Sequence, residues 1–304
     1  PLTLSLAQFP SPCRAALTTL TDLLGHSRDG FLVGGAIRDL LLSREPIDEL
    51  DVTLPSGALE MGRRLAQRSG GAFVLLDKER GAARVVPGSG TGLRQIDLSD
   101  FRADSLEGDL RGRDFTVNAI AASLRTLVRD GQAPLVDPTD GRQDLVRRRL
   151  RPAGPGALED DPLRALRGVR LALLLRFTLT PQLRSALRKS APRLSAVSAE
   201  RIREELTALL VLPHAGQGLR ELDRLGLLEA VLPEVAPMKT VAQPRPHRFT
   251  VWEHSLRAVE SGEALFSNLS VLEPYATELA AHLAEPVGDG LTRRELLKLA
   301  LLLH

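Results

Sequence analysis

The fold of this chain is decided by one stretch, which reads Phe31-Leu32-Val33-Gly34-Gly35-Ala36-Ile37-Arg38-Asp39-Leu40-Leu41-Leu42, a polar turn over residues 43–46, and then Ile47-Asp48-Glu49-Leu50-Asp51-Val52-Thr53. The apolar run at residues 31–33 is typical of a short buried strand, and the Gly34-Gly35 pair removes two side chains where that strand gives way to a helix. Free backbone N–H groups at a helix start favour an anion. The stretch therefore predicts a phosphate-binding corner, to which Arg38 can add a charged fork one turn into the helix.

Two acids follow on the next predicted strand. Polar and apolar residues alternate over residues 49–54, so Glu49 and Asp51 share one face of that strand and Asp48 points to the other. Two carboxylates on one face repel each other unless a cation lies between them, and Mg²⁺ takes oxygen ligands and also bridges to substrate phosphates. The alternative is that the acids line the solvent face of an edge strand and that the glycine pair is an ordinary turn. Because both features occur in one strand-turn-helix-turn-strand unit, we favour a magnesium site.

This opening motif resembles that of the class II tRNA nucleotidyltransferase and bacterial poly(A) polymerase superfamily. One departure is visible, because the family usually has Asp-x-Asp where this chain has Glu49-Leu50-Asp51. The resemblance implies that Glu49 and Asp51 are catalytic and hold the metal. It also implies that Gly34, Gly35 and Arg38 bind the nucleotide.

The length and charge of the chain are compatible with this resemblance. The chain has 304 residues, enough to bury more than one hydrophobic core, and a net charge of +2. Lysine occurs only at positions 78, 189, 239 and 298, so nearly all positive charge is arginine, which suits bidentate contacts to phosphates and base edges. An arginine-rich composition inherited from a GC-rich genome is the alternative explanation. The charge balance permits a nucleic-acid partner without requiring one.

The cysteine content and the hydropathy of the chain argue against several other classes of protein. Cys13 is the only cysteine, so neither a disulfide framework nor a thiolate zinc site can form within the chain. The apolar runs at residues 171–177 and 296–303 are far too short to span a bilayer, and the N-terminus has no basic region followed by an apolar core. We therefore expect a soluble protein of the reducing cytoplasm, with no membrane partner.

The periodicity predicts an α+β chain with a mixed head and a helical body. Helices are expected over residues 14–24 and 58–69, and strands over residues 72–76, 83–86 and 95–98. Beyond about residue 142 the strand signals fade and helical periodicity takes over. We expect a nucleotidyltransferase head over 1–142, a helical neck and body over 143–240, and the start of a further helical domain over 241–304. The resemblance implies that the head has a polymerase-β-like fold.

A third acid, Asp97, lies in the strand predicted at residues 95–98. A carboxylate on a strand next to Glu49 and Asp51 would complete a two-metal site, in which one ion activates the attacking hydroxyl and the other stabilises the leaving group. Asp97 also occupies the position where the resembled family has its third strand acid, which implies a catalytic role. Taken alone, it would be read as a solvated residue.

A second motif reads Gly112-Arg113-Asp114-Phe115-Thr116-Val117-Asn118-Ala119. It is similar to the family's Arg-Arg-Asp-Phe-Thr followed by Asn-Ala, with Gly112 in place of the first arginine. Arg113 and Asp114 together suit a ribose, because a carboxylate accepts from the 2′-hydroxyl while a guanidinium donates to it or to a phosphate. Such a contact would separate ribonucleotides from deoxyribonucleotides. The resemblance adds Asn118 to the nucleotide-binding residues, and a surface ion pair before a helix is the alternative.

A helix predicted to begin near Leu158 contains the side chains that we expect to select the incoming nucleotide. Asp161, Arg164 and Arg167 recur every three residues, which places one acceptor and two donor forks along one side. In the resembled family, the Asp and Arg of a Glu-Asp-x-x-Arg motif form a protein template for the incoming base. Cytosine and adenine offer an amino group to Asp161 and a ring acceptor to Arg164, whereas uracil and guanine reverse both groups. Helix-initiation chemistry, with acids and Pro162 in the first turn, is the structural alternative.

Two later segments also match family patterns. Residues 198–206 resemble the fifth family motif, and we interpret them as a helix with Ser198 as N-cap and an Arg201–Glu205 pair, which braces the templating helix. The segment from His247 to His254 is similar to the start of an HD-type metal phosphohydrolase domain. The Asp of its His-Asp pair would be the residue after His304, so we expect the chain to end inside that motif.

A polar turn at residues 135–145 resembles the third family motif, so five motifs occur in the family's order over about residues 30–210 and together imply a function. The implied reaction is attack of the 3′-hydroxyl of tRNA on the α-phosphate of CTP or ATP, which releases pyrophosphate and uses Mg²⁺. The acceptor end of tRNA is the expected partner, and DNA is not. Full CCA-adding members usually carry a flexible segment before the second motif, and only residues 101–106 bridge that gap here, as in members that add CC alone. Two rivals stay open: a poly(A) polymerase, and an inactive RNA-binding module, because Glu49 and Gly112 break the family pattern.

Overall fold

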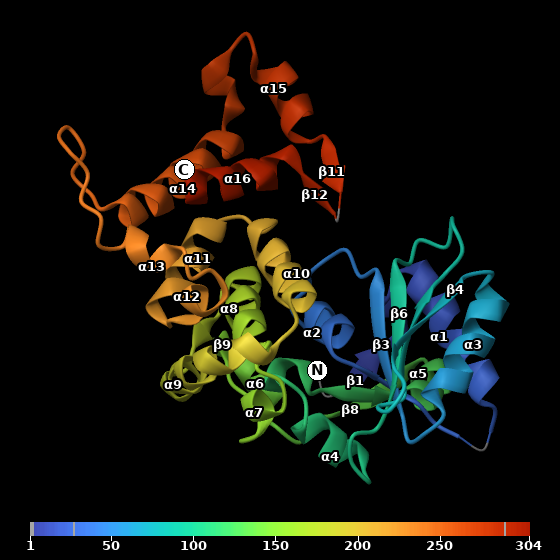
Figure 1. Ribbon diagram of the computed structural model, residues 1–304. Coiled ribbons are helices and arrows are strands. Elements are labelled where there is room, and N and C mark those ends of the chain that lie inside the picture. Colours follow the sequence, from blue (N-terminus) through green and yellow to red (C-terminus); the bar gives the residue numbers. More distant parts are fainter. Residues whose placement is uncertain (1–2, 27, 289) are drawn as a thin grey trace. The chain divides into compact units, whose positions relative to one another are not determined.

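The computed structural model describes residues 3–26, 28–288 and 290–304, which fall into two compact units (Figure 1). Unit 1 comprises Pro1–Ala157 and unit 2 comprises Leu158–His304. The domain limits at residues 142 and 240 stay predictions. Among the described residues, no helix is both long enough and apolar enough to cross a membrane.

Unit 1 is built on an eight-stranded mixed sheet. Its strands are β1 (Thr3–Ser5), β2 (Phe31–Val33), β3 (Glu49–Leu54), β4 (Ala72–Asp77), β5 (Ala82–Val86), β6 (Gln95–Asp100), β7 (Ala121–Ser123) and β8 (Gln132–Val136). They are arranged in the order β1-β8-β7-β2-β3-β6-β5-β4. The pairing of β3 with β6 is parallel, whereas β3 pairs with β2 in the antiparallel sense. The mixed head predicted from the sequence is therefore confirmed.

Helices alternate with these strands along the chain. They are α1 (Ser11–Leu24), α2 (Gly35–Leu41), α3 (Ala58–Ser69), α4 (Leu106–Arg111), α5 (Leu124–Asp130) and α6 (Gly141–Val146), with 3-10 turns at Leu6–Gln8 and Thr116–Asn118 and a short strand β9 (Arg149–Leu150). Helix α7 (Ala157–Asp160) begins at the last residue of unit 1 and continues into unit 2. One face of the sheet is covered by α1, α3 and α5, and α3 packs on β4, β5 and β6 (Figure 1). The apolar residues of β3, which are Leu50, Val52 and Leu54, are buried. Strand alternation places Glu49 and Asp51 on the opposite face.

Most predicted elements of unit 1 are confirmed, and three strands of the eight-stranded sheet were missed. The helix predicted over residues 58–69 matches α3, and the three strands predicted between residues 72 and 98 match β4, β5 and β6 with small extensions. Strands β1, β7 and β8 had no prediction. They are short, β7 is Ala-rich, and β8 contains Pro134, so each lacks the β-branched alternation that marks a strand. Their stability comes from pairing along the sheet rather than from local preference.

Unit 2 is helical apart from three very short strands. Its elements are α8 (Arg164–Leu175), β10 (Thr178–Leu179), α9 (Pro181–Ser190), a 3-10 turn at Ala191–Ala196, α10 (Ala199–Leu210), α11 (Ala215–Arg224), α12 (Leu227–Val231), α13 (Val235–Met238), α14 (Val251–Ser267), a 3-10 turn at Leu269–Leu272, α15 (Ala276–Leu283), β11 (Pro286–Gly288), β12 (Leu291–Thr292) and α16 (Arg293–Leu303). Helix α8 packs against α10 and α11, and α14 packs against α11 and α16. The predicted change from mixed to helical structure is confirmed.

A buried ion pair joins four helices of unit 2. The ammonium of Lys298 in α16 lies 3.0 Å from a carboxylate oxygen of Glu263 in α14, and both side chains are almost fully buried. The same ammonium donates to the backbone carbonyls of Leu210 and Leu212 at the end of α10. Glu263 accepts the first backbone N–H groups of α11, from Ala215 and Gly216, at 2.7 and 3.1 Å. Each charged atom therefore has partners that offset its loss of hydration.

Replacing Lys298 with Met should destabilise the protein. The substitution leaves Glu263 buried without its cation, which costs about 3 to 5 kcal/mol when one partner of a buried pair is removed. The free energy of unfolding, measured by urea denaturation, should fall by about that amount relative to the exposed-site control Lys189→Met. Equal unfolding free energies for the two variants would contradict the structural role of this pair.

Candidate active site

The acids predicted to hold metal lie on two neighbouring strands. In the parallel pairing of β3 with β6, Asp51 is directly opposite Asp97 and Glu49 is opposite Gln95. Strand alternation therefore brings Glu49, Asp51 and Asp97 to one face of the sheet. The sequence indicated a third acid on a strand, and the structure identifies that strand as the direct neighbour of β3.

The electrostatics of Asp51 show how closely these charges interact. Burial and the nearby charge of Asp97 raise the pKa of Asp51 above its usual value. The positive charges of Arg113 and Arg38 and the backbone N–H of Gly35 act in the opposite direction and lower that pKa. The carboxyl of Asp51 therefore lies where predicted nucleotide-binding residues converge.

The glycine corner packs directly on Asp51. Gly34 precedes α2 with φ of 77°, a backbone conformation that suits glycine. A Cβ atom at Gly34 would lie 2.7 Å from Oδ2 of Asp51, so a side chain there would displace that carboxylate. The two halves of the opening motif are thus in contact, and the glycine is required on both conformational and steric grounds.

Two arginines that the sequence analysis did not single out hold the other two acids. The Arg94 guanidinium forms an ion pair with Glu49, and its Nε lies 3.5 Å from Oδ2 of Asp48. Arg84 in β5 donates both Nε and Nη2 to the carboxylate of Asp97, at 2.8 and 2.9 Å. Arg84 alternates with buried Ala83 and Val85, so strand periodicity identifies its face, but its partner depends on the register of β5 with β6.

The donor set suits a divalent cation without forming a closed cage. No group of three or more His, Cys, Asp or Glu side chains that could hold a metal occurs among the residues that the structure describes. Glu49 and Asp51 supply two carboxylate donors on one strand face, and Gly34, which has no side chain, leaves the Asp51 carboxylate in place. Mg²⁺ commonly binds through one or two carboxylates plus substrate phosphates, so this open set fits the predicted ion.

Arg38 and the second motif form one hydrogen-bonded chain. Arg38 is buried, donates two hydrogen bonds to Asp39 and donates a third, at 2.7 Å, to the side-chain oxygen of Asn118. Asn118 in turn donates to Asp114 at 3.1 Å. These bonds link α2 to the second motif. The guanidinium of Arg38 is therefore hydrogen-bonded to side chains of the protein itself.

Arg113 is held by a buried acid that the sequence analysis did not single out. Its guanidinium donates to Oδ2 of Asp109, which lies one turn earlier, at 3.0 and 3.2 Å. The other oxygen of Asp109 accepts the backbone N–H of Arg102. Asp109 thereby ties the short segment that follows β6 to the second motif.

In unit 2, the residues predicted to recognise the base do not all lie on one helix. The helix predicted from Leu158 is interrupted, because α7 ends at Asp160 and α8 begins at Arg164. Asp161 lies in the interruption, where it caps the backbone N–H of Leu163 and pairs with Arg201 at 2.7 Å. Arg164 is buried at the start of α8.

Helix α10 braces this segment through different pairs from those predicted. Glu205 is buried and accepts from Arg167 at 2.8 Å and from Arg170 at 2.7 Å. These two arginines hold the pKa of Glu205 below its usual value despite its burial. The predicted Arg201–Glu205 pair within α10 is wrong, because Arg201 reaches Asp161 instead. The bracing role of α10 is confirmed.

Two family models match this chain. Residues 30–151 match the "Poly A polymerase head domain", and residues 176–239 match the "Probable RNA and SrmB- binding site of polymerase A". The chain therefore contains the head domain and the RNA-binding region of the poly(A) polymerase family.

Named relatives are similar in sequence over most of this chain. It is 34% identical to a CC-adding tRNA nucleotidyltransferase of Geobacter sulfurreducens, over 99% of this chain and 64% of that protein. It is 43% identical to an A-adding tRNA nucleotidyltransferase of Deinococcus radiodurans, over 75% of this chain and 50% of that protein. The Thermotoga maritima CCA-adding enzyme complexed with tRNA superposes with a TM-score of 0.71 at 21% identity, over all of this chain and 67% of that one. The chain thus spans about half to two thirds of the length of these relatives.

Three histidines of unit 2 lie close together. The His254 ring lies 5.4 Å from that of His247 and 5.0 Å from that of His304, measured between centroids. The sequence analysis linked these histidines across 50 residues, and the structure brings them together.

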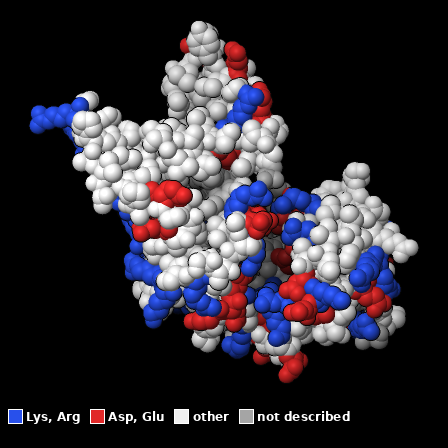
Figure 2. All heavy atoms as spheres, in the orientation of Figure 1, with Lys and Arg blue, Asp and Glu red and all other residues white. Residues whose placement is uncertain are grey.

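An exposed basic segment connects α13 to α14. No acid occurs between Glu234 and Glu253, and residues 244–249 are exposed, with Arg245 and Arg248 among them. Figure 2 shows Lys or Arg atoms at the end of this projecting segment, whereas positive and negative side chains are interleaved over much of the remaining face shown. The segment therefore offers positive charge to a polyanion such as RNA.

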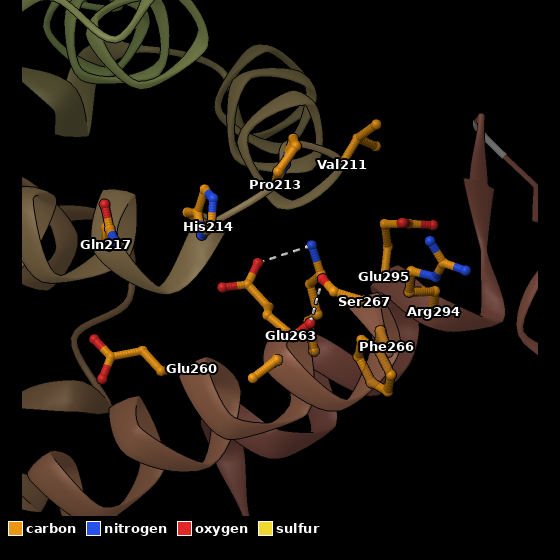
Figure 3. Close-up of a pocket in the computed structure, with 12 residues that line it drawn as sticks. Val211, Pro213, His214, Gln217, Glu260, Glu263, Phe266, Ser267, Arg294 and Glu295 are labelled. Carbon is orange, nitrogen blue, oxygen red and sulfur yellow. Dashed lines mark hydrogen bonds and ion pairs between the residues drawn. The ribbon is translucent and has the colours of Figure 1, made fainter. Parts of the chain in front are cut away.

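A pocket of about 600 Å³ is lined by residues of unit 2 (Figure 3). It is lined by side chains from the α10–α11 connection, α14 and α16. Three acids face it, and each has a partner: Glu263 pairs with Lys298, Glu260 pairs with Arg220, and Glu295 caps Thr292. Its polar groups are thus largely engaged in holding the helices together.

Replacing Gly34 with Ala should disrupt the site beyond ordinary backbone strain. Gly25 is the matched control, because it also has positive φ, 68°, but a Cβ atom there meets nothing within 4 Å. Gly25→Ala should cost about 1 to 3 kcal/mol, because its positive φ is one that residues with a side chain rarely adopt. Gly34→Ala should lower the free energy of unfolding, measured in urea, by more than Gly25→Ala does. It should also weaken Mn²⁺ binding, because its methyl group displaces the Asp51 carboxylate. Equal losses of stability and unchanged metal affinity in both variants would contradict the contact.

Proposed function

We propose that this chain is a tRNA nucleotidyltransferase that adds CC to the 3′ end of tRNA, using CTP and no nucleic-acid template. The observation that carries the proposal is the set of three carboxylates, Glu49, Asp51 and Asp97, on one face of β3 and β6 beside the glycine corner. The named relatives add C or A to tRNA, which supports this substrate over generic RNA. The proposed location is the cytoplasm, in keeping with a single, buried cysteine.

The chemistry follows from the residues around Asp51. Glu49 and Asp51 would hold Mg²⁺, which when bound supplies charge neutralisation for the triphosphate and lowers the pKa of the attacking hydroxyl. The backbone at Gly34-Gly35 approaches the phosphates, with the start of α2 directed toward the anion. The 3′-oxygen of tRNA bonds to the α-phosphorus, the bond to the β-phosphate oxygen breaks, and pyrophosphate leaves. The protein's contribution is position and charge, as in other phosphoryl transfers.

Nucleotide selection is assigned to the interrupted segment before α8. Asp161 accepts an amino group of the base and Arg164 donates to its ring nitrogen, which fits cytosine and opposes uracil. The Arg201–Asp161 pair and the Glu205 pairs with Arg167 and Arg170 hold these groups in place. In the head, Arg113, Asp114 and Asn118 are proposed to bind the ribose and phosphates.

The short segment after β6 supports CC addition over full CCA addition. Only five residues, 101–105, separate β6 from α4. Within them, the backbone of Arg102 is tied to buried Asp109, which restricts the segment. A restricted connection leaves little freedom for the site to change its base preference between successive additions. The exposed basic segment between α13 and α14 is proposed to contact the tRNA backbone.

Removing Glu49 should abolish nucleotide addition, whereas removing Asp48 should not. Glu49→Gln keeps the side-chain volume but removes the charge on the site face, so CTP addition to tRNA should fall by about 100-fold or more. Asp48→Asn removes a charge from the residue just before β3, which contacts Arg94 but is not proposed to hold the metal, and should stay within about threefold of the parent. If Asp48→Asn were the inactive variant, the register assigned to β3 would be wrong.

Removing Asp161 should relax the choice of base. Asp161→Ala should lower CTP incorporation and raise the UTP-to-CTP incorporation ratio by about tenfold or more, because the acceptor that excludes uracil is lost. Asp160→Ala removes the adjacent exposed acid and is the matched control. An unchanged ratio in Asp161→Ala would move nucleotide selection away from this segment.

A further inference from the structure

Arg84 occupies one end of a row of charges across the sheet. In register, Arg84 of β5 lies opposite Asp97 of β6, which lies opposite Asp51 of β3. The Arg84 fork engages both oxygens of Asp97, at 2.8 and 2.9 Å. Three adjacent strands thus place a cation, an anion and a second anion in line on one face.

This fork changes what Asp97 can offer to a metal ion. A carboxylate in a bidentate pair has both oxygens in charge-assisted hydrogen bonds, and the guanidinium beside it repels an approaching cation. Asp97 could give an oxygen to a metal near Asp51 only by sharing or leaving the Arg84 fork. The side chains of Arg84 and Asp97 are partly exposed, so solvent weakens the pair without abolishing it.

The Arg84–Asp97 pair also reduces the negative charge that an incoming nucleoside triphosphate would meet. Three acids with no arginine would bind a cation tightly but would repel the triphosphate. With Arg84 on Asp97 and Arg94 on Glu49, the five side chains carry a net charge of only −1. A less negative site accepts a metal together with a highly charged anion.

We propose that Arg84 is a positioning residue that withholds Asp97 from the metal site until a nucleotide binds: its fork occupies both oxygens of Asp97, whereas Arg94 contacts one oxygen of Glu49. The inference rests on the proposed function, because it explains how the site admits a nucleoside triphosphate. Arg84 acts through Asp97 and does not itself touch the reacting atoms.

The test is a double-mutant cycle on metal affinity in the full chain without nucleotide. Mn²⁺ binding is measured by electron paramagnetic resonance for the parent, Arg84→Gln, Asp97→Asn and the double variant. Arg84→Gln should tighten Mn²⁺ binding by about fivefold, a coupling typical of contacting residues. Asp97→Asn should remove that gain, so the double variant should match Asp97→Asn alone.

Steady-state kinetics with CTP on the same variants test how Arg84 affects nucleotide binding. Arg84→Gln should raise KM for CTP by about fivefold with a smaller change in kcat, because the freed carboxylate repels the triphosphate. Arg84→Lys keeps the positive charge but loses the fork, so its Mn²⁺ affinity should lie between those of the parent and Arg84→Gln.

Arg129→Gln is the matched charge control. Arg129 pairs with Asp130 on the surface of the same unit, so its loss changes net charge equally and should leave Mn²⁺ affinity within about twofold of the parent. An Arg84→Gln variant that folds with unchanged or weaker Mn²⁺ binding would overturn the proposal. So would a gain that persists in the double variant, because it would then arise from net charge rather than from Asp97. The metal readout is independent of tRNA extension, so failure of the parent to extend tRNA would count against the proposed function alone.

Discussion

Like-charge repulsion between Asp51 and Asp97 is the constraint on which the rest of the head depends. Parallel pairing of β3 with β6 holds the two residues opposite each other, and the charge of Asp97 raises the pKa of Asp51. The surrounding positive groups reduce this cost: Arg84 grips Asp97, while Arg113, Arg38 and a backbone N–H at the start of α2 act on Asp51. A sheet that tolerates this arrangement is prepared for a cation and a polyanion.

Local chemistry was sufficient to predict much of the head. The glycine corner, the alternation over residues 49–54 and the amphipathic pattern of residues 58–69 each depend on near neighbours in the sequence, and β3, α2 and α3 form as expected. The assignment of Glu49 and Asp51 to one strand face also follows from period-two geometry. The change to helical structure was visible for the same reason.

Pairings between distant residues could not be predicted in this way. Arg84 meets Asp97 only because of the β5–β6 register, and Asp161 meets Arg201 only because α10 packs near the start of α8. The local rule for pairs four residues apart favoured Arg201 with Glu205, but a buried acid gains more from two arginines of α8 than from one exposed neighbour. Strands β1, β7 and β8 likewise depend on their partners in the sheet.

The central claim is that this acid-bearing head, with a base-selecting segment beyond it, adds CC to tRNA. The most direct measurement is to incubate tRNA that ends at its discriminator base with CTP and ATP together, and then to sequence the 3′ ends. The account predicts molecules that end in CC and are extended no further. Complete CCA ends, runs of A or unextended tRNA would contradict it.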